Sequence, residues 1–506
     1  MNMEIFLEYR PLWAVLISLL AAALIMISGK HRNLRESWTI LAAVGKILIV
    51  FSMIPAVLAG KVFEIEPFYI AQGISLHLKA DPAGMLFAVL ASFLWLVTSF
   101  YSIGYMRKLK ESHQTGYFAS FAVCLSATMG IAFAGNLLTF FVFYEMLTIA
   151  TYPLVIHKRT DEAIKAGRKY LAYTLISGQV FLIGIVWAQY SAGTCEFQPG
   201  GFLAGAASNG ALQIMFILMV LGAAVKAGVM PFHGWLPSAM VAPTPVSALL
   251  HAVAVVKAGA FGIVRIVGFV FGPQLLSELG VADVIAWVAA FTIIVASIIA
   301  MAQDNLKKRL AFSTIGQLSY VVLGVMLLTP LGMLGGMYHV VAHAVMKITL
   351  FFCAGAIYAT THITNISQMN GLGKQMPYTM AAFTVGVLGI TGLPFTVGFI
   401  SKWNLALGAL DAGKGIYIAV LICSAMLSAT YYLPIVYAAF FKKPDKYLLE
   451  HDYGEANLVM LVPLLVTATI SIILGVFPNA GVHLYDLAAL ATESIFKNAN
   501  LMIGGL

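Results

Sequence analysis

Charged residues are scarce in this chain. Only 10% of its 506 residues are Asp, Glu, Lys or Arg, whereas 61% are hydrophobic. Soluble domains carry about 25% charged residues, and the mean hydropathy of this chain is +0.92. The composition therefore excludes a soluble globular protein and indicates a protein embedded in a membrane.

Cysteine is scarce as well. The four cysteines are far apart in the sequence, at Cys124, Cys195, Cys353 and Cys423. Iron–sulfur and zinc sites need clustered Cys, or Cys with His, and the sequence has no CxxC motif and no Cys/His cluster. We therefore expect no cofactor and no metal site in this chain.

Long polar segments are also missing. The longest connections, near 60–82 and 191–210, are too short for a soluble catalytic domain, so residues 1–506 are expected to form one transmembrane domain. The net charge of +8 is spread over many short loops, which argues against nucleic-acid binding. No redox or hydrolytic site is recognisable, so any enzymatic activity would belong to a larger complex.

Apolar runs of membrane-spanning length are abundant. A helix needs about 20 apolar residues to cross a bilayer. Fourteen runs meet this condition, near residues 11–28, 39–59, 83–105, 116–134, 136–156, 166–190, 211–228, 242–268, 282–302, 307–328, 332–360, 377–409, 415–440 and 456–477. We predict an all-α polytopic membrane protein of about fourteen helices.

Two of these runs contain or adjoin helix-breaking residues. Run 377–409 includes GITGLPFTVG, and run 211–228 is followed by GVMPFHGWLP. Both helices should be broken, and paired broken helices point to an internal repeat. We predict two five-helix units, residues 116–268 (helices 4–8) and 282–440 (helices 9–13), inverted relative to each other because each has an odd number of spans.

Basic residues alternate between the two sides of the predicted membrane. One set of loops carries 18 Lys and Arg residues and the other set carries 6, namely Arg10, Lys61, Lys79, Arg265, Lys414 and Lys497. Positive residues favour the cytoplasmic side. We expect a bacterial or archaeal cytoplasmic membrane protein with both termini outside.

Some ionisable residues remain inside the predicted spans. A lysine at the centre of a span costs roughly 2.5–3.5 kcal/mol, so such residues usually face a bundle interior or a water-filled cavity. They are Lys46, Lys226, Lys257, Lys347, Lys402, Glu145, His251, His339 and His343. A functional role is favoured for all of these lysines except Lys46, for which a structural role is equally plausible.

The stretch MYHVVAHAVMKITLFF places His339, His343 and Lys347 four residues apart. This spacing turns by only about 80° in total, so the three side chains share one helix face. It favours a water-bridged proton relay. A zinc site and histidines bonded to helix backbones are the alternatives.

Glu145 and Lys226 are natural partners within the apolar interior. A lone buried carboxylate must be protonated or paired with a cation, and Lys226 lies just before the first predicted break. Moving Glu145 away would favour proton release from Lys226. The next helix carries His251 and Lys257 at different depths, and Lys402 lies beside the second break.

Three long segments resemble a known family. They are PFHGWLPSAMVAPTPVSALLHAVAVVKAG, DNLKKRLAFSTIGQLSYVVLG and YHVVAHAVMKITLFFCAGAI. They resemble the antiporter-like, proton-translocating membrane subunits: the L, M and N subunits of complex I, the A-type and D-type subunits of Mrp cation/proton antiporters, and the corresponding subunits of membrane-bound hydrogenases and formate hydrogenlyases. The resemblance covers about residues 110–440.

The resemblance implies a site and partners. It implies that Glu145 pairs with Lys226, that His251, Lys257, His339, His343 and Lys347 form a central relay, and that Lys402 ends the path. It also implies other membrane subunits as partners, including antiporter-like paralogues, and protons as the transported ion, with Na+ as a candidate coupled ion. An Mrp-D-like subunit is favoured. A subunit of a redox complex, a stand-alone proton-coupled carrier and a structural scaffold are the alternatives.

Overall fold

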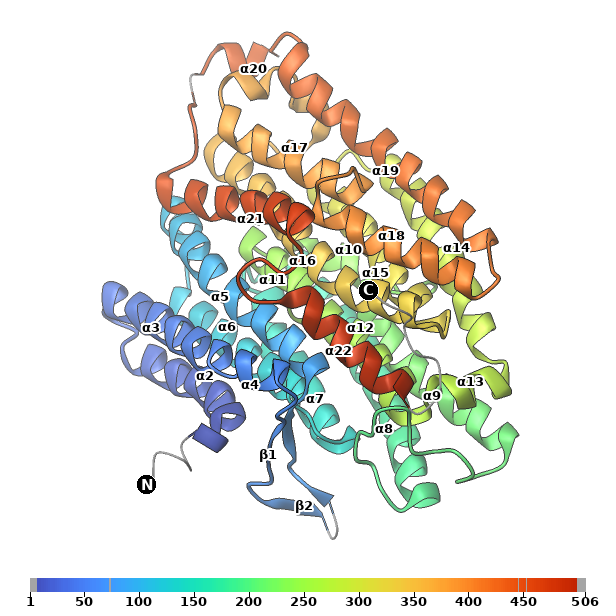
Figure 1. Cartoon of the computed structure of the whole chain (residues 1–506). Coiled ribbons are helices and arrows are strands. Elements are labelled where there is room, and N and C mark those ends of the chain that lie inside the picture. Colours follow the sequence, from blue (N-terminus) through green and yellow to red (C-terminus); the bar gives the residue numbers. More distant parts are fainter. Residues whose placement is uncertain (1–6, 72–73, 445, 452, 498–506) are drawn as a thin grey trace.

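The structure is a computed structural model that describes residues 7–71, 74–444, 446–451 and 453–497. Helices make up most of it (Figure 1). The first helices are α2 (Arg10–Ile27), α3 (Arg32–Phe51), α4 (Ile54–Leu58), α5 (Pro82–Lys108), α6 (Gln114–Ala132), α7 (Leu137–Val155), α8 (Asp161–Ala192) and α9 (Asn209–Ala227). Four short strands follow α4: β1 (Phe63–Ile65), β2 (Tyr69–Ala71), β3 (Ile74–Ser75) and β4 (Leu78–Ala80).

The rest of the described chain is also helical. The helices are α10 (Trp235–Ser238), α11 (Thr244–Ala252), α12 (Val255–Arg265), α13 (Pro273–Leu279), α14 (Ala282–Met301), α15 (Leu306–Met326), α16 (Pro330–Thr361), α17 (Pro377–Thr391), α18 (Val397–Asp411), α19 (Ile416–Phe441), α20 (Lys446–Leu449), α21 (Leu458–Val476) and α22 (Leu484–Phe496). Shorter elements are η1 (Ala239–Val241), η2 (Ile266–Phe271), η3 (Ile366–Gln368) and η4 (Leu372–Lys374), of which η2 is a π-helix.

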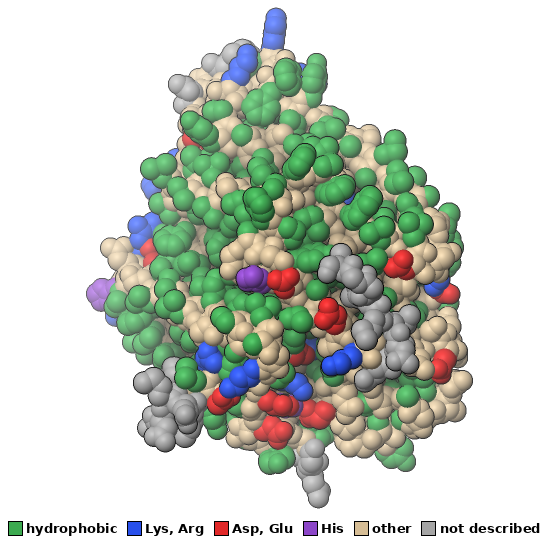
Figure 2. Space-filling model, in the orientation of Figure 1, with side chains coloured by type: hydrophobic (Ala, Val, Ile, Leu, Met, Phe, Trp, Pro, Cys, Tyr) green, Lys and Arg blue, Asp and Glu red, His purple; other side chains and the backbone are tan. Residues whose placement is uncertain are grey.

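The predicted membrane-spanning architecture is confirmed. Among the described residues, 13 helices are long and apolar enough to cross a membrane. The remaining predicted run, 377–409, is divided into α17 and α18. Figure 2 shows hydrophobic side chains covering much of one face of the molecule, while acidic side chains gather in its lower half. The chain is an all-α, multi-pass membrane protein.

Both predicted helix breaks are present. Helix α9 ends at Gly228, which has the left-handed φ of +76° that favours glycine. Helix α17 ends in the same way at Gly392, with φ +86°. The two units predicted from the sequence, 116–268 and 282–440, therefore each contain a broken helix.

A third interruption was not predicted. The run 242–268 was expected to be continuous, but α11 ends at Ala252 and α12 begins at Val255. The backbone of Ala254 leaves the helical region, with φ −96° and ψ −95°. No proline or glycine lies at this point, so the sequence carried no breaker signal. The interruption separates His251 from Lys257.

Helix α16 forms the centre of the molecule. It contacts α11, α15, α17, α18 and α21, and its most apolar window is completely buried. Small residues allow this close packing: a Cβ added at Gly335 would lie 2.7 Å from the backbone nitrogen of Leu405. The polar residues of α16 are therefore held far from lipid.

The strands form a small extension at one end of the bundle. Strand β1 pairs antiparallel with β4, and β2 pairs antiparallel with β3. In Figure 1 they project below the helices. Helix α22, which was not predicted, packs against α5 and α16.

Candidate functional site

Lys226 and Glu145 meet beside the first helix break. Lys226 is fully buried in the last turn of α9. Its Nζ lies 3.9 Å from Oε1 of Glu145 on α7 and donates a hydrogen bond to the carbonyl of Tyr144, at 2.5 Å. The same Nζ lies 3.2 Å from the centroid of the Tyr144 ring. The ammonium group is thus stabilised by a carboxylate, a carbonyl and an aromatic face.

Space for the Glu145 carboxylate comes from a glycine. A Cβ at Gly178 of α8 would lie 2.2 Å from Oε1 of Glu145. The Glu145 side chain is 15% exposed, so the pair lies where α7, α8 and α9 pack together. The break beyond Lys226 is fixed by Trp235, whose Nε1 donates to the carbonyl of Val225 at 2.8 Å.

A second group of polar side chains lies around α16. Nζ of Lys257, on α12, is 2.9 Å from Nδ1 of His343. One turn earlier, Nδ1 of His339 is 2.8 Å from Oγ of Ser401, on α18. The two imidazole centroids are 6.3 Å apart. Four side chains from three helices therefore form a series across the buried centre of the bundle.

The hydrogen-bond partners assign a direction to this series. Oγ of Ser401 donates to the carbonyl of Gly398 at 3.1 Å, so it accepts from Nδ1–H of His339 and leaves Nε2 of His339 as an acceptor. Lys257 donates to Nδ1 of His343, which places the ring proton of His343 on Nε2. No described residue is within hydrogen-bonding distance of either Nε2. A donor and an acceptor thus remain for a bridging water.

Lys347 contacts helices other than those that carry the partners of the two histidines. Its Nζ donates to the carbonyl of Leu310 at 3.3 Å, to Oγ of Ser313 at 2.8 Å and to the hydroxyl of Tyr432 at 3.3 Å. These partners lie on α15 and α19. His339, His343 and Lys347 are all buried on α16, as their spacing predicts, but Lys347 has hydrogen-bond partners different from those of the two histidines.

Lys402 lies at the second helix break. Its Nζ donates to the carbonyl of Ile390, on the other side of the break. It also lies 5.3 Å from the ring centroid of Tyr320. The Tyr320 ring in turn stacks on His339 with centroids 5.2 Å apart. Tyr320 therefore links the end of the series to Lys402.

Two predicted interior residues lie apart from this series. The His251 ring packs 4.7 Å from the ring of Phe351, and neither of its nitrogens bonds to a described residue. Lys46 donates to the carbonyl of Leu125 at 3.1 Å and lies 4.6 Å from the ring centroid of Trp95. The interactions of Lys46 are those of a structural cation.

Sequence reasoning missed several polar partners. Ser401 adjoins Lys402 in the sequence, which is the one signal that could have drawn attention to it. Tyr144, Tyr320, Ser313 and Tyr432 resemble ordinary core residues in the sequence, because their contacts come from other helices.

Arg265 was also misplaced. It was counted in an outer loop, but it is 1% exposed and its guanidinium contacts Asp81 with two hydrogen bonds, at 2.5 and 2.8 Å. Three phenylalanine rings surround it, those of Phe197, Phe261 and Phe269. A bidentate partner is what allows a guanidinium to be buried in this way.

The relatives of the chain are membrane subunits. It is 31% identical over 417 residues to NADH-quinone oxidoreductase subunit N of Desulforudis audaxviator (strain MP104C), covering 79% of this chain and 82% of that protein. Its fold matches a chain in the structure of the Mrp complex from Dietzia sp. DQ12-45-1b with a TM-score of 0.87, 22% identity and coverage of 97% and 98%. It also matches a chain of the membrane-bound sulfane sulfur reductase, an archaeal respiratory membrane complex, with a TM-score of 0.84, 24% identity and the same coverage.

The family itself follows from a second, independent match. Residues 134–428 match the family described as NADH:quinone oxidoreductase/Mrp antiporter, TM. That range contains Glu145, Lys226, the series around α16 and Lys402. Among the described residues, no group of three or more His, Cys, Asp or Glu is placed to hold a metal ion. The chain belongs to the NADH:quinone oxidoreductase/Mrp antiporter family of membrane subunits.

Proposed function

We propose that this chain translocates protons across the membrane as an antiporter-like subunit of a multi-subunit complex. The observation that carries the proposal is the buried series Lys257, His343, His339 and Ser401, in which donors and acceptors follow one another in a single direction. Buried ionisable groups in a membrane protein are expensive unless they line a pathway.

The proton would move by successive transfers between neighbouring groups. Lys257 passes a proton to Nδ1 of His343, and His343 releases the proton on its Nε2. A bridging water carries that proton to Nε2 of His339. His339 then releases the proton on its Nδ1 at Ser401, beside Lys402. The transfer leaves the ring proton of His343 on Nδ1 and that of His339 on Nε2, so both histidines must rotate or exchange tautomers, and Lys257 must be reprotonated, before the next proton moves.

The Glu145–Lys226 pair would control when protons reach this series. At about 4 Å and an effective dielectric constant of about 20, the attraction between opposite unit charges is about 4 kcal/mol. Charge movement in a neighbouring subunit that drew Glu145 away would remove this attraction and favour proton release from Lys226. The path would begin at Lys226 or Lys257, use Lys347 as a further protonatable group, and end at Lys402.

Two complexes remain candidates for the host of this chain. An Mrp-type cation/proton antiporter, with the chain as its Mrp-D-like component, is favoured by the fold match to the Mrp complex. A redox complex is favoured by the sequence match to an NADH-quinone oxidoreductase component. Mass spectrometry of the proteins that co-purify with the chain distinguishes the two, because a redox complex brings subunits with redox cofactors. We assign no cofactor to this chain itself.

The proposal is tested with the intact complex in proteoliposomes. Lys226→Ala should abolish proton transport, while the complex assembles as before. Lys414→Ala, which removes a partly exposed loop lysine paired with Asp283, should leave transport unchanged. Full transport by the Lys226→Ala complex would overturn the proposed role of Lys226.

A further inference from the structure

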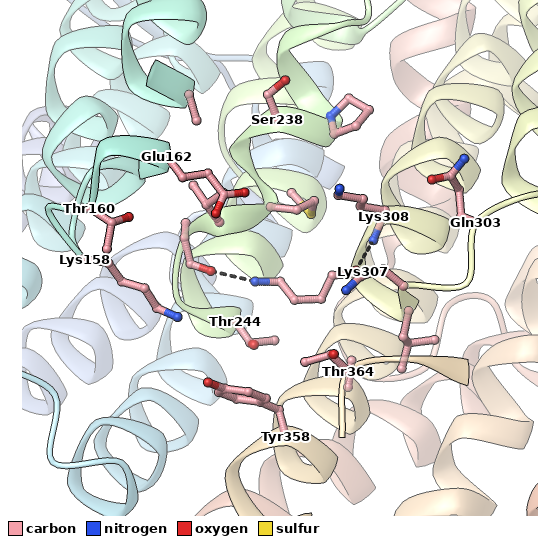
Figure 3. Close-up of a pocket in the computed structure, with 18 of the residues that line it drawn as sticks. Lys158, Thr160, Glu162, Ser238, Thr244, Gln303, Lys307, Lys308, Tyr358 and Thr364 are labelled. Carbon is pink, nitrogen blue, oxygen red and sulfur yellow. Dashed lines mark hydrogen bonds between the residues drawn. The ribbon is translucent and has the colours of Figure 1, made fainter. Parts of the chain in front are cut away.

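A large cavity in the structure is lined by none of the residues of the proton series. It has a volume of about 890 Å³. Its walls come from the start of α8, the segment around α10 and η1, the start of α15 and the residues after α16 (Figure 3). The cavity therefore lies between the two predicted repeats, at the end of the bundle where α8 and α15 begin.

Lysines dominate the wall of this cavity. Five lysines line it, together with a single carboxylate, Glu162: they are Lys158, Lys165, Lys169, Lys307 and Lys308. Figure 3 shows Lys158 on one side of the cavity and Lys307 and Lys308, neighbours at the start of α15, on the other. Hydroxyl and amide groups also line the cavity, including those of Ser238, Thr244 and Gln303.

The positive charge of these lysines is not balanced by protein carboxylates. Within the described part of the chain, none of the five forms an ion pair. Their partners are neutral: Lys307 donates to the carbonyl of Ala242 at 2.6 Å, and Lys169 donates to Oγ of Ser238 at 3.1 Å. Each ammonium has three donors, so most of this hydrogen-bonding capacity is left for a ligand.

The positive charge of the cavity favours the binding of an anion over a role in collecting protons. A concave surface lined by one sign of charge raises the local concentration of the opposite charge and repels its own. Hydronium would be repelled here. A phosphate group would accept from several ammonium, hydroxyl and amide donors at once.

We propose that this cavity binds a phosphate-bearing anion, supplied by the headgroup of an anionic phospholipid. Basic pockets between membrane helices on the cytoplasmic side bind anionic headgroups, and this cavity lies at the lysine-rich end of the helices. The bound phosphate would join α8 in the first repeat to α15 in the second. Through Lys307 it would also support Ala242, which precedes α11.

The test uses the purified full-length chain in a neutral detergent. Short-chain phosphatidylglycerol, short-chain phosphatidylcholine and inorganic phosphate are each titrated, and the midpoint of thermal unfolding is measured. Lipid adducts are counted by native mass spectrometry. The pocket variant is Lys158→Gln/Lys165→Gln, because both side chains are exposed and their replacement should not affect folding. The matched control is Lys442→Gln/Lys443→Gln, which removes the same charge from exposed positions outside the cavity.

Phosphatidylglycerol should raise the unfolding midpoint, and phosphatidylcholine should not. The pocket variant should bind phosphatidylglycerol about thirtyfold more weakly, whereas the control should bind it as the wild type does. If inorganic phosphate reproduces the shift at similar concentrations, the anion site stands and its ligand is free phosphate. Equal responses of the wild type and the pocket variant, or no response to either anion, would overturn the proposal. None of these outcomes depends on whether the chain transports protons.

Discussion

At the scale of single residues, hydrogen bonds decide which buried groups can exchange protons. The histidines of α16 have defined donor and acceptor nitrogens because each has one partner on another helix, Lys257 for His343 and Ser401 for His339. Ser401 is a positioning residue in this arrangement. It holds His339 so that its Nε2 accepts, and a histidine with the opposite tautomer would interrupt the series.

Replacing Ser401 tests this positioning role. Ser401→Ala should slow proton transport by about tenfold, since a hydrogen bond of this kind contributes about 0.5–1.5 kcal/mol. Ser401→Thr, which keeps the hydroxyl, should restore most of the rate. Transport is measured in proteoliposomes by a pH-sensitive dye. Ser18→Ala removes a hydroxyl that is equally buried but lies far away on α2, and it should have no effect; an unchanged rate in Ser401→Ala would show that Ser401 does not position His339.

At the scale of elements, the broken helices depend on very close backbone contacts. A Cβ added at Gly398 of α18 would lie 2.1 Å from the carbonyl oxygen of Gly389 on α17. This contact brings the two halves of the broken helix together and places Ser401 and Lys402 beside α16. Some loops outside the helices, by contrast, are held by polar contacts between side chains. His77 makes such contacts.

Gly398→Ala should force α17 and α18 apart. We expect it to destabilise the chain by about 1–3 kcal/mol, the usual effect of overpacking, and to lower the midpoint of thermal unfolding. Gly415→Ala is the control, because nothing lies within 4 Å of a Cβ at that position. Equal midpoints for Gly398→Ala and the wild type would show that the two halves can separate without loss.

His77 should make stability depend on pH. Burial lowers its pKa, but its hydrogen bond to Glu196 and the charges of Glu196, Glu64 and Glu66 outweigh burial, so the pKa is raised above its usual value of 6.5. Its stabilising contribution is therefore complete below pH 6.5 and is lost as the pH rises through the raised pKa. The pKa of Glu196 is lowered from 4.5; burial opposes this shift, but its hydrogen bonds to His77 and Asn136 outweigh burial.

The prediction is that His77→Gln destabilises the chain more at about pH 5.5 than at about pH 9, because charged His77 is present only at the lower value. Glu196 remains charged at both values. Thermal unfolding of the purified chain at the two pH values measures the difference. His31→Gln, at an exposed position, should show no such dependence, and a pH-independent effect of His77→Gln would contradict the assignment.

At the scale of the whole molecule, the ends of the bundle differ in charge. The cavity described above combines Tyr105 of α5 with residues that follow α7, α9, α14 and α16 in the chain. The segment around 237–242 carries no Lys or Arg, so the distribution of positive charge alone could not assign it to one side of the membrane. In the structure this segment lies beside Lys169 and Lys307. The alternation of the spans and the packing of the loops therefore both assign this segment to the same side of the membrane as the lysine-rich loops.

Cysteine labelling tests the orientation of this charged end. In a Cys423→Ser background, Lys443→Cys should react with a membrane-impermeant maleimide only after the cells are permeabilised. Lys61→Cys should react in intact cells, because basic loops favour the cytoplasm. The remaining cysteines, Cys124, Cys195 and Cys353, are buried. Labelling in the reverse order would place the lysine-rich end outside.

Much of the fold follows from local sequence patterns. Membrane helices form because a lipid environment leaves backbone groups no other partners, so long apolar runs determine their number and approximate limits. Gly228 and Gly392 marked two breaks for the same local reason. The break between Ala252 and Val255 and the helix α22 carried no comparable signal, since packing against other helices decides them.

The sequence by itself determined that this is a membrane protein, that nine of its ionisable residues lie within the helices, and that Glu145, Lys226 and Lys402 lie beside broken helices. Only the tertiary structure decided that His343 contacts Lys257, that His339 contacts Ser401, that Lys347 contacts α15 and α19, and that Arg265 is buried against Asp81. The physical reason is that hydropathy and helix periodicity are properties of neighbouring residues, whereas a hydrogen-bond partner in a bundle comes from a helix distant in sequence. The same distinction explains the lysine cavity, whose five lysines come from two separate segments that meet only when the helices pack.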